Sequence, residues 1–555
     1  MAWRNIYFKS ISIVTLWRTS LSIAMFFLMY DVFGQTERNK KEVINITSSF
    51  KPSIVKTGKI EFSASPLSKD LSSYDFVYPI AKTQFSTPMR SFMVRPLAYK
   101  SDALDKDTSS VYAKLGYGNL NTPFASLGLK QEFTGSTLSF IADHISSKGN
   151  LPDQELQNSS VAVKFRQRIA ENQSMDFSAG YDRDAYRLYG FDHSLFSFNS
   201  TELKQQFNNI FIGAGYRIIT GVKNQATFSP TLRLDLLSAS RNVQEQLIKF
   251  NLPLSYTISN TWRIHAEPTA ELVQLRSAQD KKYSNTLFTV PVFAIYSKGK
   301  LQVKAGIIPV SQTETFNVAP DILVTYALRQ SGVKVKAGVS NVFRMNSYHS
   351  LYGLNPFVLT PDTLTISHTT DYFVGFDFVN AKGFQLRFKT GVIQYQNQPL
   401  FYNSSIDGKN LVSISDQSFT ALNLEAGVDY SLSRQLSITA SVQAFSFADF
   451  VGQMKAYGIL PLTFSGGISW KPLKALHIKG RVFLWQGAMA KDLLMKDIRL
   501  KGAADISMGI EYSLNKKWAL WTDLNNIANI TYQRWHQYPS FGFHAMGGVR
   551  YSIHK

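Results

Sequence analysis

Hydrophobic and polar side chains alternate along much of this chain with the period of a β-strand. Near the C-terminus, between Asp505 and Leu514, every second residue is apolar and most of the residues between are polar. The apolar positions are Ile506, Met508, Ile510, Tyr512 and Leu514. Because strand side chains point alternately to the two faces of a sheet, this stretch predicts a strand with one apolar and one polar face. About 22 such runs follow one another from Ser109 to the end of the chain.

The connectors between the runs alternate between short and long. Short turns are predicted, for example, at Thr134-Gly135, Lys471-Pro472-Leu473 and Asn515-Lys516-Lys517. The longer connectors are 147–158, 190–203, 342–365, 397–417, 486–498 and 529–541. A soluble β-propeller or sandwich would also show alternating strands, but it would not place short and long connectors at opposite ends. The pattern therefore predicts an all-β fold, a transmembrane antiparallel β-barrel of about 22 strands with short periplasmic turns and long extracellular loops.

The N-terminal part differs from the rest of the chain. Residues 1–35 have basic side chains followed by the short apolar run Leu21–Tyr30, which predicts a secretory signal peptide cleaved near residues 34–36. An uncleaved N-terminal anchor is the alternative. Residues 36–108 are rich in proline and predict a periplasmic or lumenal segment, either a reduced plug or a lining, ahead of the barrel at 109–555.

Charge and cysteine content exclude several classes of function. Lys and Arg number 59 and Asp and Glu number 39, for a net charge of +20. The basic residues are spread through the strands without a compact stripe, so nucleic acid is not the expected partner. The chain has no Cys, which excludes disulfides, thiolate metal sites and a lipidated N-terminal Cys.

The C-terminal stretch resembles the end of TonB-dependent receptor barrels. The matching residues are Asn515-Lys516-Lys517, Asp523-Leu524-Asn525-Asn526, Tyr532, Trp535, Tyr538-Pro539, Gly542 and Gly548–Ile553. Such barrels usually end in Tyr-x-Phe, whereas this chain has Tyr551-Ser552-Ile553 followed by two more residues. The Phe-Gly-Gln end of the signal and the basic charge resemble Bacteroidota proteins. The resemblance implies a Gram-negative outer-membrane location among lipids, and a partner that is a TonB-type energising protein or a surface lipoprotein.

The N-terminal segment departs from the family pattern. A TonB-dependent receptor carries a globular plug, and residues 36–108 are short for a full plug, so we expect a plug that is reduced or missing. The run Glu42–Thr47 is a candidate strand for adding to a partner's sheet edge. An ordinary strand resting on the barrel wall is the alternative.

No catalytic motif is present, so we expect no enzyme activity and no cofactor or metal centre. His193, His349 and His536 lie in predicted outer loops and would make a metal or haem site only if those loops converge; solvated loop histidines are the alternative. The candidate lumen-lining basic residues are Lys164, Arg166, Arg168, Arg387, Lys389, Lys479, Arg481 and Arg550. They would either attract anions or pair with carboxylates in a structural network.

The predicted outer loops are aromatic. The candidate loop aromatics are Tyr348, Tyr352, Tyr532, Trp535 and Tyr538. They would bind a ligand or partner, or else anchor the barrel at the membrane interface. The function expected from sequence is uptake of a substrate across the outer membrane. The alternative is a barrel subunit of a multi-protein envelope complex that transports nothing.

Overall fold

The computed structural model describes residues 110–554, apart from 222–224, 313–314, 329–331, 381–382, 416 and 451–453. The predicted signal peptide, the segment 36–108 and the run Glu42–Thr47 lie outside the described residues. No helix in the described part of the chain is long and apolar enough to cross a membrane.

The main sheet of the described residues contains 26 antiparallel strands. In the first half they are β1 (Ser110–Gly118), β2 (Thr122–Phe133), β3 (Ser136–Ser147), β4 (Leu156–Ala170), β5 (Gln173–Arg187), β6 (Lys204–Thr220), β7 (Ala226–Phe228), β8 (Thr231–Ala239), β9 (Val243–Asn251), β10 (Leu254–Thr257), β11 (Trp262–Ala266), β12 (Thr269–Arg276) and β13 (Lys282–Thr289). In the second half they are β14 (Val292–Lys298), β15 (Leu301–Gln312), β16 (Phe316–Ala327), β17 (Val333–Asn346), β18 (Thr365–Val379), β19 (Phe384–Gln396), β22 (Ser418–Ser431), β23 (Leu436–Ala448), β24 (Leu462–Leu473), β25 (Leu476–Trp485), β28 (Ala503–Ser513), β29 (Trp518–Asn525) and β32 (His544–His554).

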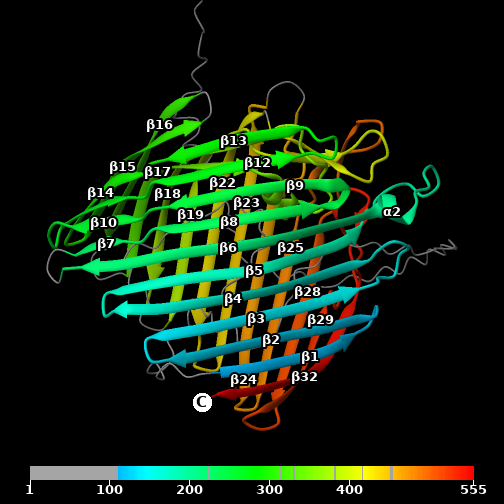
Figure 1. The fold of residues 1–555 in the computed structure, drawn as a ribbon, viewed down its shortest axis with the longest axis horizontal. Coiled ribbons are helices and arrows are strands. Elements are labelled where there is room, and N and C mark those ends of the chain that lie inside the picture. Colours follow the sequence, from blue (N-terminus) through cyan, green and yellow to red (C-terminus); the bar gives the residue numbers. More distant parts are fainter. Residues whose placement is uncertain are drawn as a thin grey trace, which may run out of the picture. The chain divides into compact units, whose positions relative to one another are not determined.

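The sheet closes on itself to form a barrel. β1 pairs with β32 from Ser110↔His554 to Gly118↔Met546, which brings the first and last strands side by side (Figure 1). β7 with β8, β9 with β10, β11 with β12, and β13 with β14 are each two halves of one wall strand, so the barrel has 22 strands. The prediction of an all-β antiparallel barrel of about 22 strands is therefore confirmed.

The two faces of the wall have the chemistry that the alternation predicts. On β1, Val111, Leu115 and Tyr117 are exposed on one face, whereas Lys114 is buried on the other. Exposed apolar side chains repeat in the same way around the wall. An apolar outer face and a polar inner face are what a barrel wall between lipid and water requires.

The long connectors lie at one end of the barrel and carry small elements of their own. These are α2 (Ser200–Leu203), α3 (Tyr348–Leu354), the hairpin β20 (Leu400–Asn403) with β21 (Leu411–Ile414), the hairpin β26 (Met489–Lys491) with β27 (Asp497–Arg499), and the hairpin β30 (Gln533–Trp535) with β31 (Tyr538–Pro539). The short connector between β8 and β9 is the single turn η1 (Ser240–Asn242). The predicted turn at Lys471-Pro472-Leu473 is wrong, because these residues belong to β24. The pairing register of β24 with β25 shifts between Trp470 and Leu473, so an irregularity in the ladder accommodates Pro472.

Five prolines interrupt or kink five neighbouring wall strands at one level. We call Pro230, Pro253, Pro268, Pro291 and Pro309 the proline row. The Ser229 N–H donates to the Pro253 carbonyl at 3.1 Å, and the Leu252 N–H donates to the Pro268 carbonyl at 2.9 Å. In the same way, the Glu267 N–H donates to the Pro291 carbonyl and the Val290 N–H donates to the Pro309 carbonyl, both at 2.9 Å. Each of these proline carbonyls accepts one hydrogen bond from the neighbouring strand. The bond that the proline position would donate back, the return bond, is missing because proline has no N–H.

The wall strands β16 and β17 part near the level of the proline row. Their pairing runs from Ala327↔Lys334 up to Ile322↔Val339 and then ends, although both strands continue. Pro320 lies just beyond this point, and its carbonyl accepts a hydrogen bond from the Asn341 side chain at 2.7 Å. Since a proline cannot donate to the neighbouring strand, its position accounts for the end of the ladder there.

Candidate functional site

The long outer loops fold together into one packed structure, which we call the loop cap. It consists of the described residues of 188–203, 347–364, 397–417, 449–461, 486–502 and 526–543. Buried apolar side chains from four of these loops form a single cluster with the inner face of the upper wall. Aromatic loop residues therefore serve here as a core, because they remove large apolar areas from water.

Tyr538 of β31 lies at the centre of the loop cap and is fully buried. Its ring stacks on Phe357, with 3.5 Å between ring centroids, and meets Tyr189 edge-on at 5.1 Å. Its hydroxyl donates to the Lys409 carbonyl. Gly190 packs directly on this ring, and a Cβ there would come within 2.3 Å of a ring carbon. Residues from four loops thus meet on one tyrosine.

Trp535 of β30 makes a second centre. Its indole meets Phe401 edge-on at 5.5 Å between centroids. Gly458 lies against it with a φ of +76°, and a Cβ at Gly458 would come within 2.7 Å of the indole. The Gly458 carbonyl accepts a hydrogen bond from Arg534 Nη2 at 2.8 Å, and its N–H donates to the Met489 carbonyl at 2.9 Å. The hairpin β30–β31 therefore contacts cap loops 397–417 and 449–461, and Gly458 links it to cap loop 486–502.

A polar latch holds loops 449–461 and 486–502 together. The Tyr457 hydroxyl donates to the Asp497 carboxylate at 2.6 Å. Lys455 and Lys491 form ion pairs with the same carboxylate at 3.0 and 3.4 Å. The hydrogen bond from Tyr457, followed by the two lysines, lowers the pKa of Asp497, so the latch stays charged at neutral pH.

Helix α3 is fastened to the wall by a carboxylate. Glu245 of β9 accepts the N–H groups of Tyr348 and His349 at 2.5 and 3.0 Å, and Ser347 accepts from the Ser350 N–H at 3.1 Å. The first N–H groups of a helix have no partner within it, so these acceptors complete the helix N-terminus. Burial raises the pKa of the Tyr348 phenol to about 12, which keeps that side chain neutral.

The predicted loop aromatics all lie in or against the loop cap. Tyr352 stacks on Phe207 of the wall at 4.2 Å between centroids, and Tyr348 packs against the same ring at 5.5 Å with its plane tilted by 55°. Tyr532 meets Trp485 edge-on at 4.6 Å and donates its hydroxyl to Asp505 at 2.8 Å. The structure brings the five residues into the cap, where they contribute to packing; a direct ligand contact by any of them stays a prediction.

Four of the eight predicted lumen-lining basic residues form ion pairs with carboxylates on neighbouring strands. Lys389 lies 2.5 Å from Asp371 and 3.9 Å from Glu425. Arg387 pairs with Asp429 at 2.5 Å and Arg550 with Glu511 at 2.7 Å, and Arg166 pairs with Asp176. This arrangement favours the structural-network interpretation for these four, because each basic group is neutralised locally.

The other four predicted basic residues are placed differently. Lys164 and Arg168 lie on exposed positions of β4 and form no ion pair with any described residue. Lys479 and Arg481 lie on β25, where they stand opposite Gly509 and Ser507 of β28. Attraction of anions into the lumen by these residues stays a prediction.

The three predicted loop histidines do not form a metal site among the described residues. His193 packs against Phe191 with its ring tilted by 32°, and His349 stacks on Tyr352. His536 is in the hairpin of the loop cap, where burial lowers its pKa. Within the described part of the chain, no group of three or more His, Asp or Glu side chains is arranged to hold a metal ion.

Glu245, the latch residues and Arg534 were not among the residues predicted from the sequence. In the sequence, Glu245 is one more polar residue of an alternating strand. Nothing near it indicates that it binds the N-terminus of a helix about a hundred residues further along the chain. Arg534 had a signal that could have been used, since it is a lone cation beside Trp535 in the most aromatic loop.

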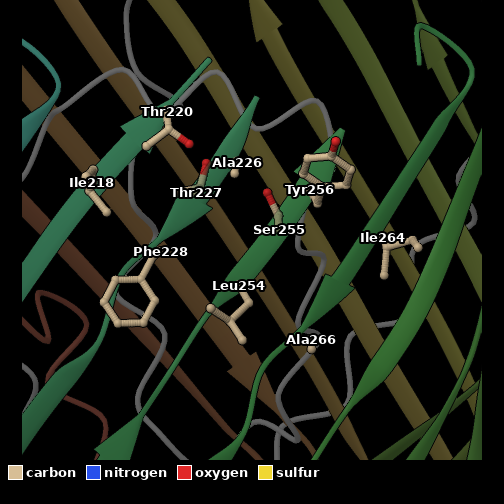
Figure 2. Close-up of a pocket in the computed structure, with 10 residues that line it drawn as sticks. All are labelled: Ile218, Thr220, Ala226, Thr227, Phe228, Leu254, Ser255, Tyr256, Ile264 and Ala266. Carbon is tan, nitrogen blue, oxygen red and sulfur yellow. The ribbon is translucent and has the colours of Figure 1, made fainter. Parts of the chain in front are cut away.

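One hollow in the described residues lies on the wall and not in the loop cap. It has a volume of about 310 Å³ and is lined by side chains of β6, β7, β10 and β11, among them Phe228, Tyr256 and Ile264 (Figure 2). These three side chains are exposed on the apolar face of the wall. The hollow is therefore part of the surface that faces lipid in a membrane barrel.

The sequence matches no protein-family model and no curated protein. Several solved structures have a similar fold. An FrpB iron transporter from Neisseria meningitidis has a TM-score of 0.65 at 11% identity, over 81% of this chain and 82% of that chain. The siderophore receptor PirA from Acinetobacter baumannii has a TM-score of 0.63 at 8% identity, over 81% of both chains. A ferric enterobactin receptor (PfeA) mutant from Pseudomonas aeruginosa has a TM-score of 0.60 at 12% identity, over 80% of both. At such identities the likeness is one of fold, and this chain shares its barrel fold with these transporters and receptors.

Proposed function

We propose that this protein is an outer-membrane receptor that takes up a solute, and that its own loop cap closes its outer mouth. The observation that carries the proposal is the loop cap on a 22-strand barrel. A wall of this size encloses a lumen wide enough for a solute, and a packed cap provides a surface that can recognise one and then yield. The fold likeness to iron and siderophore transporters supports the same function.

The proposal includes an outer-membrane location after removal of a signal peptide near residues 34–36. Residues 36–108 would then be a periplasmic or lumenal segment, and Glu42–Thr47 the candidate strand for a TonB-type energising partner. A surface lipoprotein over the loop cap is the other candidate partner. The exposed apolar face of the wall supports a lipid environment.

A disulfide across the loop cap tests the proposal. Val358 and Leu411 come from two different cap loops and pair with each other in a parallel β-bridge, so they are neighbours across the junction that the disulfide is to lock. The chain has no Cys, so the variant Val358→Cys/Leu411→Cys has a single possible bond. The measurement is single-channel conductance of the purified full-length protein in planar bilayers, first oxidised and then reduced. Val358→Cys alone is the control.

For an uptake receptor we expect transient openings in the reduced protein and in the control, and none in the oxidised double variant. The alternative function is a barrel subunit of an envelope complex that transports nothing. The dense packing of the loop cap is the observation that favours it, since a rigid cap suits a scaffold. If the reduced protein never conducts, even when Tyr538→Ala removes the centre of the cap, the scaffold replaces the receptor.

A further inference from the structure

Arg534 is a half-buried cation that forms no ion pair with any described carboxylate. It lies in β30 of the loop cap, directly before Trp535. Its Nη2 atom donates to the Gly458 carbonyl at 2.8 Å, and the guanidinium carbon lies 4.1 Å from the centre of the Trp535 ring. Its Nη1 atom is buried and has no hydrogen-bond partner among the described residues. No charged group influences its pKa, which burial alone lowers to about 10.

A guanidinium in this setting is unusual on physical grounds. At neutral pH it remains protonated, and it has five N–H donors to satisfy. Buried arginines are ordinarily paired with a carboxylate, because removal of a charge from water is costly without compensation. A buried donor that lacks a partner in a folded protein points to an acceptor that is absent from the protein itself.

The surrounding residues hold the guanidinium in a fixed position. Trp535 is buried and provides a flat surface on which a guanidinium stacks well. Gly458 fits between Trp535 and Phe401 only because it lacks a side chain, and this brings its carbonyl to Arg534. The arginine is therefore pre-organised with one edge occupied by protein and the other edge unoccupied by any described group.

We propose that Arg534 binds the anionic group, carboxylate or phosphate, of a solute that enters the loop cap. A planar guanidinium binds both kinds of anion through paired N–H donors. The inference rests on the proposed function in that it gives the solute a chemical class.

The test is calorimetric titration of the purified full-length protein with inorganic phosphate and, separately, with citrate, in buffer of low ionic strength. The variants are Arg534→Gln, which removes the charge, and Arg534→Lys, which keeps the charge without the planar fork. Arg499→Gln is the matched control, since Arg499 is an exposed arginine of the neighbouring cap loop. We expect Arg534→Gln to weaken the binding of at least one anion at least tenfold. Arg534→Lys should weaken it less, and the control should bind as the wild type does.

Thermal unfolding separates ligand binding from a structural role. If Arg534 binds a solute anion, phosphate or citrate raises the melting temperature of the wild type and the Arg499→Gln control but not that of Arg534→Gln. If the arginine serves only the fold, Arg534→Gln melts lower without anion, and the anion effect is the same in both proteins. That result, or the lack of anion binding by the wild type, overturns the proposal.

These outcomes are independent of the conductance experiment. Anion binding is measured at equilibrium and needs no transport, whereas the disulfide experiment needs no ligand. If the protein shows openings but binds no anion at Arg534, the receptor function stands and this ligand class is removed from it. Anion binding to a barrel that never conducts would leave a binding site on a scaffold.

Discussion

The rings of Tyr538 and Phe357 lie 3.5 Å apart between centroids and are inclined by only 14°. The two residues are 181 positions apart in the sequence and belong to loops on different parts of the rim. Their contact joins loop 526–543 to loop 347–364, and both rings are almost completely buried. This stack is the place where the loop cap depends most on a single pair of side chains.

We expect Phe357→Ala to loosen the loop cap. Removal of a buried phenylalanine costs about 3–5 kcal/mol, and loss of the aromatic pair is part of that cost. The measurement is the rate of limited chymotrypsin cleavage in loops 347–364 and 526–543 of the purified protein, since both loops contain aromatic residues after which this protease cuts. Leu195→Ala is the control, because Leu195 is an exposed cap residue. Cleavage of Phe357→Ala at the wild-type rate would show that the stack does not hold the cap.

Glu245→Ala should release helix α3 from the wall. The change leaves two buried helix N–H groups without acceptors, at a cost of about 1–3 kcal/mol for each unsatisfied group. Faster hydrogen exchange at the Tyr348 and His349 amides is the expected signal. Asp362→Asn, an exposed change in the same loop, should leave exchange unchanged. Equal protection in Glu245→Ala and the wild type would mean that the helix is held by its apolar contacts alone.

His536 should make the loop cap sensitive to mild acid. Burial lowers the pKa of this histidine below its ordinary value of 6.5, with Asp492 opposing the shift. The closed cap therefore binds fewer protons than an opened one once the pH falls below 6.5. Stability of the closed cap is full above that pH and is lost as the pH falls toward the lowered pKa. Cap exchange measured from pH 7.5 to 5 should accelerate in the wild type and stay flatter in His536→Gln.

Lys389→Met should destabilise the barrel wall. Lys389 is almost fully buried between Asp371 and Glu425, so its removal leaves two carboxylates without their cation. Breaking a buried ion pair on one side costs about 3–5 kcal/mol. Lys164→Met is the control, with an expected change within about 0.5 kcal/mol. Urea unfolding followed by tryptophan fluorescence measures both, and similar midpoints for the two variants would contradict the argument.

The barrel could be predicted from sequence because a wall between two solvents imposes a local rule. Each strand must alternate, so Ile506 to Leu514 identifies its own strand without knowledge of its neighbours. The loop aromatics were found for the same reason, since they stand out in polar loops. Their grouping was not predictable. The contact between Tyr538 and Phe357 depends on where each loop crosses the barrel mouth, and no local pattern encodes that crossing.

The ion-pair partners of the charged side chains could not be predicted from the sequence, for a related reason. Arg387 and Asp429 lie on adjacent strands, yet their pairing follows from a register that only the folded wall defines. A single sequence shows Arg387 as a basic residue on the inner face and leaves open whether it attracts anions or neutralises a neighbour. The strand register of the folded wall places Arg387 beside Asp429, so Arg387 neutralises that carboxylate.

The proline row is a line along which the barrel wall bends most easily. Across the boundaries between β6 and β15, the ladder loses return bonds along a single line, so bending about that line disrupts fewer hydrogen bonds than bending anywhere beside it. The upper halves β8, β9, β12 and β13 supply part of the apolar core beneath the loop cap. A tilt of this panel of the wall would pull on the cap from below, so the mechanical route by which the cap yields includes the wall that carries it.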